Sequence, residues 1–69
     1  MLSKNVKYLR KNKGYTFRAL AIKCSISTRS IKAIEDGISL NPTIRIVDKL
    51  AKEFNVTIDD LLHKDFTKE

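Results

Sequence analysis

The stretch that decides the fold reads TFRALAIKCSISTRSIKAIEDG and covers residues 16–37. It contains two apolar patterns of helical period, each about eight residues long, separated by a three-residue turn. Each pattern begins after a hydroxyl side chain, Thr16 or Ser27, of the kind that caps a helix N-terminus. We therefore predict a helix over residues 17–24 and a second helix that starts after Ser27 and ends near residue 36.

The inner faces of these two helices are expected to pack against each other. The residues that point inward are apolar: Leu20, Ala21, Ile26, Ile31 and Ile34. The small Ala21 suits a steep crossing at which the two helices approach closely. Such a bihelical unit is the kind that sets its second helix into the major groove of DNA.

Three more helices are expected outside this unit. Helical period and stop signals place them at roughly residues 3–13, 44–54 and 58–62. Thr43 and Thr57 are further hydroxyl caps. The chain shows no alternating strand pattern, so the predicted fold class is all-α, a compact five-helix bundle with short connections.

Two segments lack a helical pattern. Residues 38–42 read as an irregular loop, and residues 64–69 read as a polar tail that we expect to fray. Gly14, Gly37 and Asn55 each follow a helix, where a left-handed residue closes the last turn. The 69 residues make one domain at most, with no room for a second, ligand-sensing domain.

Charge is distributed unevenly along the chain. Residues 1–34 carry nine Lys or Arg and no acid, whereas residues 35–69 carry five bases and eight acids. This asymmetry favours a partner with dense negative charge, either nucleic acid or an anionic membrane surface; a solvated basic face without a partner is the alternative. A membrane surface is disfavoured because the basic segments need their apolar stripes for the protein's own core.

Nothing in the sequence indicates an enzyme. Cys24 is the only cysteine and is expected to be a small buried hydrophobe, and His63, the only histidine, suits a helix C-terminus. No metal-ligand spacing and no glycine-rich phosphate loop is present, so no metal or cofactor is expected. The chain has no membrane-length apolar run and no signal-like start, which makes a cytoplasmic location the expectation.

Several motifs resemble the Cro and phage-repressor family of helix-turn-helix proteins, also called the XRE type. They are TFRALA at 16–21, ISTRSI at 26–31, IEDG at 34–37, NPT at 41–43 and FNVTIDDLL at 54–62. The resemblance covers about residues 3–63, with a helix-turn-helix core at about 16–36. It implies a lambda-repressor-like domain that binds double-stranded DNA in a sequence-specific manner. The role that the resemblance implies is that of a repressor acting as a homodimer.

The resemblance assigns roles by position. Base edges are expected to meet four residues of the second helix of the motif: Thr28, Arg29, Lys32 and Ala33. DNA phosphates are expected to meet Lys11, Thr16, Phe17 and Arg18, because the free amides of a helix N-terminus attract phosphate. Arg10 and Glu35 match a pair that forms a partly buried salt bridge, and we expect both to be structural.

Three positions depart from the family pattern. Phe17 replaces a glutamine that often contacts DNA, and Ser25 stands where glycine is common in a left-handed turn. The loop after the second helix, often basic in relatives, reads DGISL at residues 36–40. Two interpretations stay open for Ile38 and Leu40: they fold back onto the core, or they contact another protein.

A second function remains open on the same fold. The chain would then be a protein-interaction module, such as an antitoxin or the partner of another regulator, with its acidic, apolar second half as the binding face. For the repressor, residues 54–58 are the expected dimer contact. Control is expected from concentration or a partner rather than from a small molecule.

Overall fold

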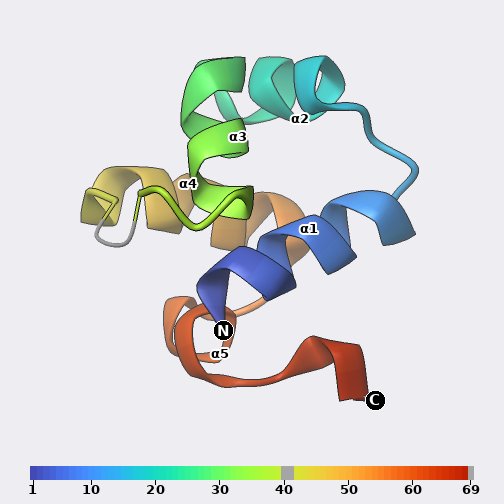
Figure 1. Ribbon diagram of the computed structural model, residues 1–69, viewed down its shortest axis with the longest axis vertical. Helices are drawn as coiled ribbons and strands as arrows, with labels where there is room; N and C mark the ends of the chain where they lie inside the picture. Colours follow the sequence, from blue (N-terminus) through green and yellow to red (C-terminus); the bar gives the residue numbers. More distant parts are fainter. Residues whose placement is uncertain (40–41, 69) are drawn as a thin grey trace.

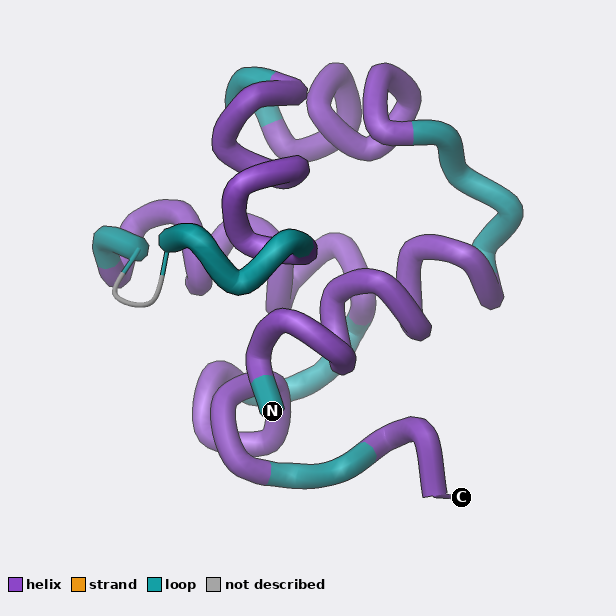
Figure 2. Tube along the Cα trace, viewed as in Figure 1, coloured by secondary structure: helices purple, strands orange, loops and turns teal. Residues whose placement is uncertain are grey.

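A computed structural model describes residues 1–39 and 42–68. Its elements are the α-helices α1 (Leu2–Asn12), α2 (Phe17–Cys24), α3 (Thr28–Glu35), α4 (Ile44–Phe54) and α5 (Ile58–His63), and the short 3-10 helix η1 (Phe66–Lys68). Every regular element in the described part of the chain is helical (Figures 1 and 2). The prediction of an all-α, five-helix fold is confirmed.

The helices begin at the hydroxyl caps that the sequence predicts. Thr16, Ser27, Thr43 and Thr57 each accept a hydrogen bond from the backbone N–H three residues further on. Such a bond satisfies one of the amide groups that a helix N-terminus leaves without a partner. Four of the five α-helices are therefore started by local chemistry; α1 has no side-chain cap of this kind.

Left-handed residues lie where helices end. Gly14 and Gly37 have φ values of +72° and +75°, and Asn55 has a φ of +58°. Ser25 has a φ of +56°, which places a residue with a Cβ atom in the turn between α2 and α3. A left-handed conformation costs such a residue roughly 1–2 kcal/mol, so this turn carries local strain.

A single apolar core lies among the five α-helices. Its buried members are Val6, Leu20, Ala21, Cys24, Ile31, Ile34, Val47, Leu50, Ala51, Phe54 and Leu61. Helix α1 packs against α3, α4, α5 and η1, so it holds the two ends of the chain together. In Figure 1, α2 and α3 lie on one side of α1, and α5 and the C-terminal segment lie on the other.

The tail is ordered, which corrects the expectation that residues 64–69 fray. Residues 66–68 form η1 against α1, and the ring of Phe66 is only 7% exposed. This aromatic side chain removes a large apolar area from water and so contributes to holding the short polar segment in place. Residue 69 lies outside the described part.

A buried asparagine fixes this tail. Asn5 on α1 is fully buried, and its side-chain amide donates to the carbonyls of Leu61, at 2.9 Å, and Lys64. Its Oδ1 accepts from the backbone N–H of Phe66 at 3.1 Å. One side chain thus satisfies three backbone groups of the C-terminal segment. This role is not visible in the sequence, because a single asparagine in an amphipathic helix looks like a surface residue.

No α-helix in residues 1–39 and 42–68 is both long and apolar enough to cross a lipid bilayer.

Replacing Asn5 should release the tail. We expect Asn5→Ala to lower the free energy of unfolding by about 2 kcal/mol, because buried backbone groups lose their partners. Amide hydrogen exchange at residues 65–68 should accelerate at the same time. Urea denaturation and exchange mass spectrometry measure the two effects. Asn12→Ala, on the exposed end of α1, is the matched control and should change neither; similar behaviour of the two variants would contradict this role for Asn5.

Candidate nucleic-acid interface

A buried ion pair connects α1 to the end of α3. The Arg10 guanidinium donates from Nε to Glu35 Oε2 at 2.7 Å and from Nη2 to Glu35 Oε1 at 3.1 Å. The two side chains are only 10% and 3% exposed. A third donor, Nη1, reaches the carbonyl oxygen of Tyr15 at 2.8 Å. This arrangement matches the pair expected from the sequence and also binds the turn that leads into α2.

Two further contacts surround this pair. The carbon of the Arg10 guanidinium lies 4.3 Å from the centre of the Phe17 ring, in a cation–π contact. The hydroxyl of Ser3 donates to the backbone carbonyl of Glu35 at 2.6 Å. Helix α1 thus holds the start of α2 and the end of α3 by specific polar contacts. The orientation of α3 is set by these contacts as well as by apolar packing.

The inner face of α3 is occupied by the core. Ile31 and Ile34 are almost fully buried and lie in the same core as Leu20 and Ala21 of α2. In the turn, directly after the left-handed Ser25, the N–H of Ile26 donates to the carbonyl of Ala21 at 3.1 Å. The underside of α3 therefore cannot serve as a binding surface.

The outer face of α3 is open. Thr28, Arg29 and Lys32 are exposed, and Ala33 is half-buried. Arg29, Lys32 and Ala33 line one hollow of about 370 Å³, together with Asp36 and Ile38 from the segment that follows. The four residues predicted to meet base edges thus lie on one accessible helix face, and three of them share this hollow.

The residues predicted to meet phosphates lie nearby but differ in availability. Lys11 and Arg18 are exposed, whereas the Thr16 hydroxyl is engaged as the cap of α2. Phe17 is half-buried, with one face covered by Arg10. Thr16 and Phe17 retain their place at the N-terminus of α2, where backbone amides rather than side chains would meet a phosphate.

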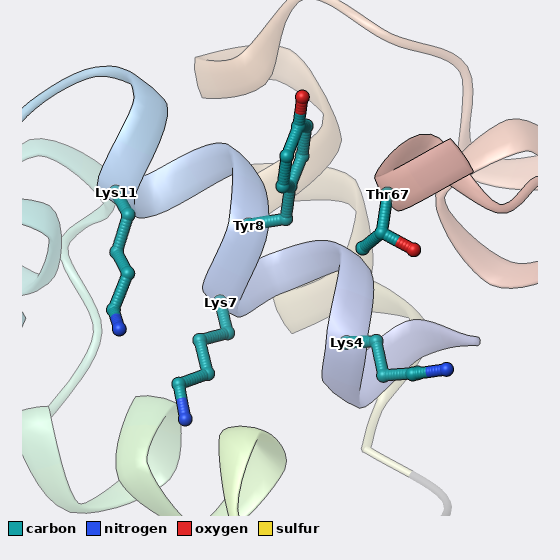
Figure 3. Close-up of a pocket in the computed structure, with 5 residues that line it drawn as sticks. All are labelled: Lys4, Lys7, Tyr8, Lys11 and Thr67. Atoms are coloured by element: carbon teal, nitrogen blue, oxygen red, sulfur yellow. The ribbon is translucent and has the colours of Figure 1, made fainter. Parts of the chain in front are cut away.

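A second hollow, of about 320 Å³, lies on α1 and is lined by Lys4, Lys7, Tyr8, Lys11 and Thr67. Figure 3 shows the side chains of Lys4, Lys7, Tyr8 and Lys11 projecting from α1, with Thr67 of η1 beside this helix. These three lysines are a third of the nine bases in residues 1–34. Of this group, only Lys11 is among the site residues predicted from the sequence.

The structure decides between the two interpretations that the sequence leaves open for Ile38. Ile38 is 76% exposed, so it does not fold back onto the core. Leu40, the other apolar residue of that loop, lies outside the described residues. The exposed position of Ile38 is consistent with a contact to another molecule.

Two ionisable side chains have raised pKa values. Burial raises the pKa of the Cys24 thiol to about 11, so the thiol stays protonated at neutral pH. The hydroxyl of Tyr15 donates to Glu53 Oε2 at 2.8 Å, and this bond to a carboxylate raises the pKa of Tyr15. Both groups are neutral near pH 7. Among the described residues, no cluster of His, Cys, Asp and Glu has the arrangement of a metal site.

A family model described as a helix-turn-helix domain matches residues 3–65 of this sequence. The chain belongs to the helix-turn-helix family. Its resemblance to the Cro and phage-repressor type, predicted from the motifs, is confirmed.

Among relatives of this helix-turn-helix protein is the HTH-type transcriptional regulator SinR of Bacillus licheniformis. It is 32% identical over 64 residues, which cover 93% of this chain and 58% of that protein. The chain thus spans little more than half of the length of this relative.

Two solved structures share the whole fold. The N-terminal DNA-binding domain of SinR from Bacillus subtilis superimposes with a TM-score of 0.89 at 29% identity, over 96% of each chain. A crystal structure of SinR in complex with DNA gives a TM-score of 0.84 at 31% identity, over 90% of this chain and 98% of that chain.

Breaking the Arg10–Glu35 pair should destabilise this helix-turn-helix domain strongly. We expect Arg10→Ala to lower the free energy of unfolding by about 3–5 kcal/mol, because it leaves a buried carboxylate without a partner. Urea denaturation monitored by circular dichroism measures this loss. The control is Lys52→Ala, which breaks the exposed pair of Lys52 with Asp48 and should have almost no effect. Equal losses for the two variants would rule out a structural role for the buried pair.

Proposed function

We propose that this chain is a sequence-specific regulator of transcription that binds double-stranded DNA, and specifically a repressor that acts as a dimer. The observation that carries the proposal is the outer face of α3, which the protein's own chain leaves open while the opposite face is held in the core. A helix presented in this way can enter the major groove. The similarity to a SinR structure in complex with DNA supports the same reading.

Charge supports a polyanionic partner. All nine bases of residues 1–34 lie in or between α1, α2 and α3, where no acid precedes Glu35. The only base among them that pairs with an acid in the described chain is Arg10. The remaining cations are available to neutralise phosphates, the main source of affinity in protein–DNA association.

The proposed contacts follow from accessibility. Arg29 donates in bidentate fashion to O6 and N7 of a guanine, and Lys32 reaches a base or a phosphate. Thr28 and Ala33 contribute a polar and an apolar contact to base edges. Lys11, Arg18 and the amides at the N-terminus of α2 position the protein on the backbone.

Dimerisation would place two copies of α3 about 34 Å apart, on half-sites one helical turn apart. Phe54, part of the expected contact, is only 5% exposed and belongs to the core of its own chain. The dimer contact would therefore use the accessible residues of this range, the exposed Asn55 and Thr57 and the half-buried Val56 and Ile58. We further infer a cytoplasmic, non-enzymatic protein whose control comes from its concentration or from a protein partner.

The alternative function is a protein-interaction module on the same fold. The apolar side chains that its binding face in the second half of the chain would offer include Ile38 and Ile44, which are 76% and 67% exposed. Binding to DNA and binding to an apolar protein face respond differently to salt, and this difference separates the two functions.

Salt should weaken binding steeply if DNA is the ligand. We expect the logarithm of the association constant to fall linearly with the logarithm of salt concentration, with a slope of about −0.9 for each phosphate contact. Lys11→Gln should reduce the magnitude of the slope by about one contact. Lys52→Gln, on α4, is the charge-matched control and should leave the slope unchanged. Binding that hardly responds to salt would favour the interaction module instead.

Selection from a random DNA pool tests sequence specificity. We expect the wild-type chain to enrich a near-palindromic sequence with half-sites one helical turn apart. Arg29→Ala should relax the preference at one base pair per half-site, at a cost of about 1–3 kcal/mol. Arg45→Ala, an exposed arginine on α4, should keep the full preference.

Two results of that experiment would count against the proposal. An unchanged preference in Arg29→Ala would show that Arg29 does not read a base. The absence of symmetry in the enriched sites, together with monomers alone in sedimentation with and without DNA, would remove the dimer.

A further inference from the structure

Tyr15, directly before α2, is held by two other helices. Its backbone N–H donates to the carbonyl of Arg10 at 3.1 Å, and its own carbonyl accepts from Arg10 Nη1 at 2.8 Å. Its hydroxyl donates to Oε2 of Glu53, on α4, at 2.8 Å. The next residue, Thr16, is the N-cap of α2. Three hydrogen bonds to α1 and α4 therefore fix the point at which α2 begins.

The first turn of α2 has little apolar anchorage of its own. The buried residues of this helix, Leu20, Ala21 and Cys24, all lie beyond its first three residues. In the first turn, Arg18 is exposed and Phe17 is half-buried. The core thus holds the later part of α2, and the position of the first turn depends on polar contacts made beside it.

Helix α4 contacts the residues on both sides of α2. Lys49 and Glu53 are four positions apart on α4 and therefore share one face of it. At one end of α2, Glu53 accepts from the hydroxyl of Tyr15. At the other end, Nζ of Lys49 donates to the carbonyl of Ser25 at the longer distance of 3.4 Å. One face of α4 thus sets the orientation of α2 at its two ends.

We propose that Tyr15 and Glu53 are positioning residues for DNA binding. Their hydrogen bond holds the first turn of α2 where its backbone amides and Arg18 reach a phosphate while α3 lies in the major groove. The inference rests on the proposed function and adds to it a pair of residues that do not themselves contact the DNA.

Two physical arguments support this role. A bond from a hydroxyl to a carboxylate is charge-assisted and therefore stronger than a bond between neutral groups. A hydrogen bond to a phosphate tolerates only a narrow range of donor–acceptor distances, so a small displacement of the first turn is enough to lose it. The pair contributes to affinity and not to base preference, because phosphate contacts position a protein and base contacts specify the sequence.

Replacement of single phosphates by uncharged methylphosphonates tests this role, because it removes one charge and leaves the bases unchanged. The probe is the duplex enriched by the wild-type chain, with each phosphate of one half-site replaced in turn. Sensitivity that Lys11→Gln abolishes belongs to Lys11, on α1. We expect a further sensitive phosphate, bound by α2, at which replacement weakens wild-type binding about tenfold, or about 1.4 kcal/mol.

Tyr15→Phe keeps the ring and removes the hydrogen bond to Glu53. At the phosphate bound by α2, the ratio of affinities for the unmodified and the modified duplex should fall from about ten toward one. Tyr8→Phe is the matched control and should keep the tenfold ratio, because the hydroxyl of Tyr8 makes no hydrogen bond within residues 1–39 and 42–68. Each ratio compares two duplexes with one protein, so a change in the folded fraction cancels.

Two variants of Glu53 separate the hydrogen bond from the charge. Glu53→Gln keeps an oxygen that accepts from the hydroxyl of Tyr15, and it should retain the tenfold ratio. Glu53→Ala removes the acceptor and should behave as Tyr15→Phe does. The sequence enriched from a random pool should be the same for all these variants, because the outer face of α3 is unchanged.

The outcomes distinguish this inference from the proposed function. Ratios that stay unchanged in Tyr15→Phe at every phosphate, or no sensitive phosphate beyond those of Lys11, would overturn the positioning role and leave DNA binding intact. An equal fall in Glu53→Gln and Glu53→Ala would assign the effect to charge and overturn it too. A chain that enriches no sequence at low salt would overturn both the inference and the proposed function.

Discussion

The ion pair between Arg10 and Glu35 is the constraint on which the presentation of α3 depends. Its two hydrogen bonds, with a third from Arg10 to the carbonyl of Tyr15, join α1, the turn before α2 and the last turn of α3. Leaving a buried charge without its partner costs free energy. Separating α1 from the end of α3 is therefore unfavourable.

This constraint divides α3 into two faces with different roles. Ile31 and Ile34 bind the helix to the core, and Thr28, Arg29 and Lys32 remain accessible on the other side. The accessible face of α3 thus presents the cations Arg29 and Lys32 to solvent.

Surface chemistry around α3 follows from how the helix ends. Gly37 turns the chain with a positive φ, and the next two amides bond back to Ala33. The isoleucine that follows this glycine thus lies beside the end of α3, with its side chain exposed.

Local signals in the sequence determined the five α-helices, their four hydroxyl caps and the left-handed residues that end them, because each depends on neighbours within a few positions. The tertiary structure alone decided the role of Asn5 and the burial of Phe66. These two residues are hydrogen-bonded to each other although they lie 61 positions apart in the sequence. It also decided that Arg10 covers Phe17 and that Ile38 stays exposed beside Ala33. Such contacts depend on how distant segments pack, and no periodicity in the sequence records that.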